Sequence, residues 1–137
     1  ATITPGPGFV GPIGAIVFGI SAGLICYWCV NFIKQKIGID DSLDVFAVHG
    51  VGGALGIILT SFFATELLGG MGLGEKINVS KQLGVQLLGL GSVIVWSAFV
   101  SWILVKLIKK LIGLRVSEED EIEGLDITSH GERVHLN

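Results

Sequence analysis

Charged side chains are scarce in this sequence. Asp, Glu, Lys and Arg make up 15% of its 137 residues, whereas a soluble domain carries about 25%. Half of the residues are hydrophobic, and they are gathered in three long blocks rather than spread along the chain. This composition excludes an ordinary soluble domain.

Cysteine is nearly absent, and the two that occur, Cys26 and Cys29, form the spacing C-Y-W-C. Such a pair can serve redox chemistry or bind a metal. Here it lies in an apolar segment with no second pair and no nearby histidine, so a membrane redox protein is a remote alternative. We expect two buried cysteines, and no metal, cofactor, enzymatic activity or nucleic-acid partner.

The N-terminal stretch ATITPGPGFVGP lacks the basic start and the separate apolar core of a signal peptide. It begins with Ala1 and has the composition of a loop. We therefore expect the chain to be a fragment of a larger polypeptide.

Three hydrophobic segments predict an all-α membrane protein. They run from about 11 to 32, 45 to 68 and 83 to 112, and each reaches the roughly 20 residues that a helix needs to cross a bilayer. We expect residues 1–112 to be a transmembrane portion and residues 113–137 to be a separate C-terminal tail.

Small residues recur at four-residue spacing in the first two segments. The two rows are Gly11, Ala15, Gly19 and Gly23, and Gly52, Gly56, Thr60 and Ala64. Dispersion rather than hydrophobicity holds helices together in lipid, so such rows predict close contacts between helices. Three helices alone have too few faces to enclose a pore and also bury both rows, which favours partner helices.

Positive charges are distributed unevenly among the loops. Lys34 and Lys36 follow the first segment, and Lys76 and Lys81 are the only positive residues of the second loop. Four more flank the end of the third segment: Lys106, Lys109, Lys110 and Arg115. The first loop and the C-terminal flank together carry six positive residues, and the second loop carries two. This difference predicts that the first loop and the C-terminus face the cytoplasm. We expect a multi-pass protein of the plasma membrane.

His49 lies inside the second hydrophobic segment, which carries no charge after Asp44. Imidazole is costly to place in hydrocarbon, so such a residue indicates a functional site. Its ring can hydrogen-bond a small polar solute or shuttle a proton. Val45 lies one turn earlier on the same helix face and would line the same pathway. A structural hydrogen bond between helices is the alternative role for His49.

Asp44 directly precedes the second segment, where a carboxylate can accept from the free N–H groups of a helix start. We predict that its side chain is the helix cap. Asp40 and Asp41 are expected to be solvated loop residues.

The tail contains a helix signal. Ser117 begins S-E-E-D, a capping-box pattern with Asp120 at its third position. A short helix from Glu118 to about Glu123 is predicted, with Gly124 ending it. Aliphatic residues mixed with the charges favour docking on the cytoplasmic face or on a partner over a wholly solvated tail.

Four stretches resemble the Amt/Mep ammonium transporters. DVFAVHGVGGALG resembles their penultimate membrane helix, and RVSEEDEIEGLDITSHGE resembles their cytoplasmic C-terminal region. VWSAFV looks like part of their last membrane helix, and TPGPGFVGPIGA resembles the outer loop and the start of the helix before these. The tail is closer in pattern to the bacterial and archaeal Amt branch than to the Rh branch.

This resemblance implies a fold larger than the chain. Family members have about eleven membrane helices and assemble as homotrimers, so the chain would supply the last three helices and the tail. By the resemblance, His49 is the second of a pair of pore histidines and Val45 an apolar pore-lining position. The implied activity is transport of ammonium or ammonia across the plasma membrane. The alternative is a non-transporting membrane assembly module that binds a PII protein.

The resemblance also assigns a regulatory role to the tail, where PII proteins of the GlnK type dock at the cytoplasmic face. The positions that match this region are Arg115, Glu118, Glu119, Asp120, Glu121, Glu123, Gly124, Asp126, Ser129, His130, Gly131 and Glu132.

Overall fold

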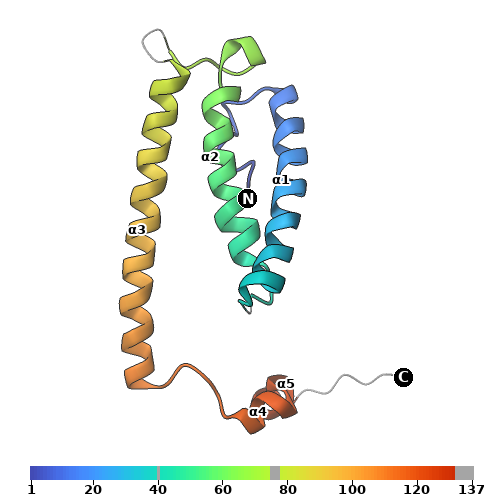
Figure 1. Cartoon of the computed structure of the whole chain (residues 1–137), viewed down its shortest axis with the longest axis vertical. Coiled ribbons are helices and arrows are strands. Elements are labelled where there is room, and N and C mark those ends of the chain that lie inside the picture. Colours follow the sequence, from blue (N-terminus) through green and yellow to red (C-terminus); the bar gives the residue numbers. More distant parts are fainter. Residues whose placement is uncertain (40, 75–77, 132–137) are drawn as a thin grey trace, which may run out of the picture. The chain divides into compact units, whose positions relative to one another are not determined.

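The computed structural model describes residues 1–39, 41–74 and 78–131. Regular structure in these ranges is helical, and no strand occurs in them (Figure 1). The chain divides into two compact units, residues 1–94 and residues 95–137. The expected boundary between a membrane portion and a tail, after residue 112, stays a prediction.

Three helical stretches of the described chain are long and apolar enough to cross a membrane: Pro12–Ile37, Phe46–Phe63 and Val79–Leu111. They coincide with the three predicted segments, which confirms the all-α membrane class. Each differs from the prediction at one end: the first stretch extends past residue 32, the second stops before residue 68 and the third begins before residue 83.

The first helix, α1, runs over Pro12–Phe32. Proline stands at its first position, where a missing N–H costs nothing. The helix continues as a π-helical run, η1, over Ile33–Ile37. Gly38 ends this run in the left-handed conformation with a φ of 73°, and its N–H donates to the Ile33 carbonyl at 2.9 Å.

The second span begins as a π-helical run, η2, over Phe46–Val51 and continues as α2 over Gly52–Phe63. The predicted end at residue 68 is wrong. The Ala64 carbonyl accepts the N–H of Gly72 at 2.8 Å, so the following loop closes back on the helix end. A single 3-10 turn, η3, occupies Glu66–Leu68 instead.

The third span, α3, covers Val79–Leu111 and begins four residues before the predicted start at residue 83. The side-chain oxygen of Asn78 accepts the N–H of Lys81 at 2.8 Å. Asparagine is among the best N-cap residues, and this cap lets the helix begin in polar sequence. None of the 33 residues of α3, all of them described, is buried within the chain.

The small-residue row of α2 packs against the N-terminal segment. Gly52, Gly56 and Thr60 are buried, and a Cβ atom added at Gly56 would overlap the backbone carbonyl of Thr2. Thr60 donates its hydroxyl to the Gly56 carbonyl at 2.8 Å, so its polar atom is satisfied. The row predicted to pack on another helix thus packs here on the turns of the N-terminal segment, and at Gly52 also on Cys26 of α1.

The row of α1 is used at one end only. A Cβ atom at Gly11 would overlap the backbone of Gly69, whereas Gly19 and Gly23 have no other group within 4 Å of such an atom. Phe18 of α1 is fully buried, and its ring packs edge to face on the ring of Phe63, with centroids 6.0 Å apart. This aromatic pair joins α1 to the end of α2.

The second unit contains two short helices, α4 over Glu118–Glu123 and α5 over Leu125–His130. The predicted cap is confirmed, because the Ser117 hydroxyl oxygen accepts the Asp120 N–H at 3.1 Å. The same hydroxyl donates to the Asp120 carboxylate at 2.6 Å. Gly124 ends α4 as predicted, with a φ of 102°. The sequence pattern did not indicate α5.

We expect Gly56→Ala to destabilise the protein by about 1–3 kcal/mol, because the added methyl has no space beside the Thr2 backbone. Gly53→Ala is the matched control: it lies in the same helix with nothing within 4 Å of an added Cβ. Thermal unfolding in detergent measures both. Equal unfolding temperatures for the two variants would contradict the packing of Thr2 on Gly56.

Candidate functional site

His49 lies in the π-helical run η2. The N–H of Gly52 donates to the carbonyl of Ala47, five residues back, which is the hydrogen bond that defines a π turn. His49 is exposed in this chain, and its ring makes no hydrogen bond within the described residues. The interhelical hydrogen bond weighed from the sequence is therefore not made inside this part of the chain.

The π turn decides which way His49 faces. An α-helix has about 3.6 residues per turn, so an uninterrupted helix would place His49 on the face of Gly56, nearly two turns later. A π turn takes in about one more residue. On the buried face of the helix, the residue one turn before Gly52 is accordingly Ala47, five residues back, and not Val48, four residues back. His49 is thereby turned away from the face that packs on the N-terminal segment.

Val45 stands just before this run and is half exposed. Four residues make close to one turn in either helix type, so the predicted common face with His49 is compatible with the π geometry. The shared pore-lining role of the two residues stays a prediction.

An open apolar cavity adjoins the His49 turn. Its volume is about 330 Å³. Three elements line it: the N-terminal segment, α1 and the residue before His49, namely Ala1, Thr2, Ile3, Phe18, Gly19, Ala22, Gly23, Cys26 and Val48. Sequence reasoning missed this cavity, although the small residues at 19 and 23 were its signal. His49 is not part of its lining.

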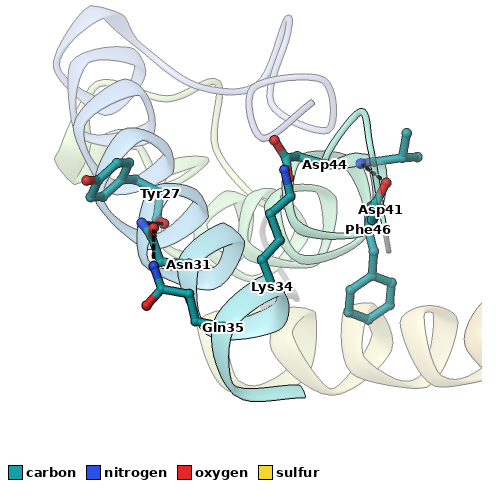
Figure 2. A network of polar contacts seen from close by, with 8 residues as sticks. Tyr27, Asn31, Lys34, Gln35, Asp41, Asp44 and Phe46 are labelled. Carbon is teal, nitrogen blue, oxygen red and sulfur yellow. Dashed lines mark hydrogen bonds and ion pairs between the residues drawn. The ribbon is translucent and has the colours of Figure 1, made fainter. Parts of the chain in front are cut away.

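The side-chain cap of this helix is Asp41, which corrects the prediction for Asp44. The two carboxylate oxygens of Asp41 accept the N–H groups of Val45 and Phe46 at 3.0 Å and 2.8 Å (Figure 2). Asp41 reaches them across the turn at residues 42 and 43. The expectation that Asp41 is a solvated loop residue is corrected too, because hydrophobic periodicity gives no signal for a side chain that reaches across a turn.

Asp44 has a different role. Its backbone carbonyl accepts the N–H of Val48 at 2.9 Å, which begins the helix. Its carboxylate forms an ion pair with the Lys34 ammonium at 2.8 Å (Figure 2). Its φ of 55° is in the left-handed region, which Asp tolerates better than most residues. Asp44 therefore ties η1 to the start of η2.

Electrostatics at the loop favour the charged form of Asp41. The Phe46 N–H, assisted by the Val45 N–H and the Lys34 ammonium, lowers the pKa of Asp41 below its ordinary value of 3.8. A lowered pKa stabilises the folded loop above pH 3.8, and this contribution is lost as the pH falls below that value.

Cys26 and Cys29 are free thiols. The Cys26 sulfur would lie 3.1 Å from a Cβ atom at Gly52, so it fills space between α1 and the small-residue row. No group of three or more His, Cys, Asp or Glu residues suited to a metal occurs among the described residues.

The tail residues singled out from the sequence gather in the two short helices of the second unit. α4 carries five of the acidic ones, α5 carries Asp126, Ser129 and His130, and Gly124 and Gly131 adopt positive φ between and after the helices. Arg115 binds Glu121 through two hydrogen bonds of 2.8 Å and 2.7 Å. Glu132 lies outside the described residues.

The Arg115 guanidinium favours the charged form of its partner, Glu121. Its side-chain hydrogen bonds lower the pKa of the Glu121 carboxyl below the ordinary value of 4.5. The bidentate pair holds α4 against the segment that follows α3, and the capping predicted for Ser117 acts on the same helix.

A family model described as the Ammonium Transporter Family matches residues 1–135. The chain belongs to this family. The match includes the helix with His49, the Asp41–Asp44 loop and most of the tail, which agrees with the resemblance seen in the sequence.

Curated ammonium transporters are similar to this chain over nearly its whole length. The ammonium transporters of Bacillus subtilis and Aquifex aeolicus are 37% and 42% identical over 134 and 133 residues. Amt1 of Archaeoglobus fulgidus is 40% identical over 133 residues. These alignments cover 96–97% of the chain but 31–33% of each relative. The chain thus spans about a third of their length, and they are named as transport proteins rather than enzymes.

We expect the Asp41 cap to control the helix start in a pH-dependent way. The amide shifts of Val45 and Phe46 should be constant above pH 3.8 and change as the pH falls below it, because protonation removes the charged acceptor. NMR titration of the labelled protein measures this. Asp41→Asn should abolish the titration, whereas Asp44→Asn should retain it. Loss of the titration in Asp44→Asn alone would reassign the cap to Asp44.

Proposed function

We propose that the protein containing this chain conducts ammonium or ammonia across the plasma membrane through a narrow apolar pore lined by His49 and Val45. The observation that carries the proposal is the family match over residues 1–135, combined with an imidazole inside a membrane-length helix. The π turn supports it further, because it keeps His49 off the face already packed on residues 1–5.

The chemistry of the solute explains why an imidazole suits this position. A bare cation is prohibitively costly to move through hydrocarbon, whereas neutral ammonia is not. A neutral imidazole has one donor and one acceptor nitrogen, and ammonia can use both. His49 therefore holds the solute by a hydrogen bond or relays the proton that ammonium gives up.

A second pore histidine, implied by the resemblance, would come from outside this chain. The other two histidines here, His130 and His135, follow residue 112 and belong to the tail. Two imidazoles sharing one site resist being protonated together, because like charges at short range raise the cost of the second proton. One proton shared by such a pair fits either a relay or a hydrogen-bonding role.

The charge distribution supports an orientation in which the C-terminus is cytoplasmic. Lys34 and Lys36 in the first loop and the four positive residues after α3 then face the cytoplasm. In this orientation Asp44 and Val45 lie at the cytoplasmic end of the second span and His49 lies about one turn deeper.

We further propose that the tail is regulatory and binds a PII protein of the GlnK type, in a homotrimer. The capped α4 and the Arg115–Glu121 pair give the tail a defined shape that can be recognised. The 33-residue α3 leaves its apolar surface unburied within this chain, which supports assembly with further helices.

His49→Ala in the intact transporter should change the preference for ammonium over methylammonium by about tenfold, since a pocket contact to one methyl is worth about that much. Purified protein in proteoliposomes, assayed without any PII protein, separates this effect from regulation. His130→Ala removes an imidazole from the tail and should leave the preference unchanged. Unchanged uptake and selectivity in His49→Ala would exclude the pore role.

Truncation before Ser117 should abolish binding of a purified GlnK-type protein, because it removes α4, α5 and the partner of Arg115. Removal of residues 133–137 alone is the control and should preserve binding. Co-elution of the detergent-solubilised transporter with the PII protein measures both. Binding retained by the Ser117 truncation would show that the partner docks elsewhere.

A further inference from the structure

The loop between the first two spans is bounded on both sides by π-helical runs. η1 ends at Ile37 and η2 begins at Phe46. Such runs are rare, and an α-helix of the same residues has better-placed hydrogen bonds. Two of them on either side of a short loop therefore require local contacts that favour the extra residue.

One such contact is the ion pair that joins the two runs. Lys34 belongs to η1 and Asp44 directly precedes the helical residues of the second span, and their charged atoms are 2.8 Å apart (Figure 2). The two side chains are 43% and 30% exposed. The pair is thus partly shielded from water, and it fixes the distance between η1 and the helix start.

The other contact is the Asp41 cap. Its two oxygens take the N–H groups of Val45 and Phe46, which have no partner within the helix at this end. The Asp44 carbonyl then receives the N–H of Val48. Asp41 and Asp44 together determine at which residue the helix begins and how it is rotated about its axis. The π run begins directly after them, at Phe46.

We propose that Lys34, Asp44 and Asp41 are positioning residues that hold η2 in its π register and so keep His49 turned away from the Gly52–Gly56 face. Without the pair, the strained φ of 55° at Asp44 relaxes and the segment shifts towards α-helical register. That shift carries His49 towards the face occupied by the N-terminal segment. The transport consequence rests on the proposed function of His49, whereas the register itself does not.

Hydrogen exchange of residues 45–52 in the intact protein, read by mass spectrometry, tests how firmly these contacts hold the π run. Lys34→Met and Asp44→Asn should each speed exchange about threefold, in keeping with a partly exposed ion pair. Asparagine retains the shape of aspartate and its tolerance of left-handed φ, so only the charge is lost. Their double variant should exchange no faster than either single variant, because both remove one interaction.

Two further variants complete the design. Lys36→Met is the matched control: it removes the same charge from the same π run, and Lys36 has no ion pair within the described chain. It should leave exchange unchanged. Lys34→Arg keeps the charge and should restore native exchange. If a variant fails to fold, added salt tests the unmodified protein, since screening of the pair should speed exchange of 45–52 there.

A measurement of transport selectivity distinguishes a role of Lys34 in positioning His49 from a role in stability alone. Lys34→Met should alter the ammonium-to-methylammonium preference in the same direction as His49→Ala, and Lys34→Arg should restore it. A merely structural role would lower the amount of active protein without moving this ratio. If exchange is faster but the ammonium-to-methylammonium preference is unchanged, the inference about the π register stands and the pore role of His49 is refuted. Unchanged exchange in both Lys34→Met and Asp44→Asn overturns the inference, whatever transport shows.

Discussion

The first unit depends on the close approach of the N-terminal segment to the small-residue row of α2. At Gly56 there is no room even for a methyl group beside the Thr2 backbone. This contact occupies one face of α2 and so determines which residues of the same helix remain available. In lipid, where burial of apolar surface gives no advantage between helices, such short contacts are the main attraction. The orientation of His49 follows from where this row ends.

The π turn reconciles this packing with an exposed histidine. Continued α-helically, the packed face would have included His49, and an imidazole beside the Thr2 backbone would have been both crowded and withdrawn from any pathway. The extra residue places Ala47 in the row instead. π turns often occur at functional sites because they re-aim one side chain without disturbing the rest of a helix. The polar loop before the turn connects this geometry to charge, through Lys34 and Asp44.

The second unit is also held by a helix cap and an ion pair. Ser117 caps α4, the bidentate Arg115–Glu121 pair holds it, and Gly124 lets the chain turn into α5. Charge-assisted bidentate pairs have a defined direction, so a tail of this kind offers an ordered shape rather than a diffuse acidic surface. The match to the ammonium transporter family extends over most of this unit, up to residue 135.

Local sequence determined much of this protein. Three runs long enough to span a bilayer follow from composition along the chain. The Ser117 cap and the stop at Gly124 follow from residue type and spacing, because each depends on neighbours within about one helical turn. The three-dimensional structure decided the rest. The cap is Asp41 and not Asp44, because the Asp41 carboxylate reaches across a turn to the N–H groups of Val45 and Phe46. α2 ends at Phe63, where the following loop closes onto the Ala64 carbonyl, and a π turn leaves His49 exposed. None of these contacts leaves a periodic signal in the sequence.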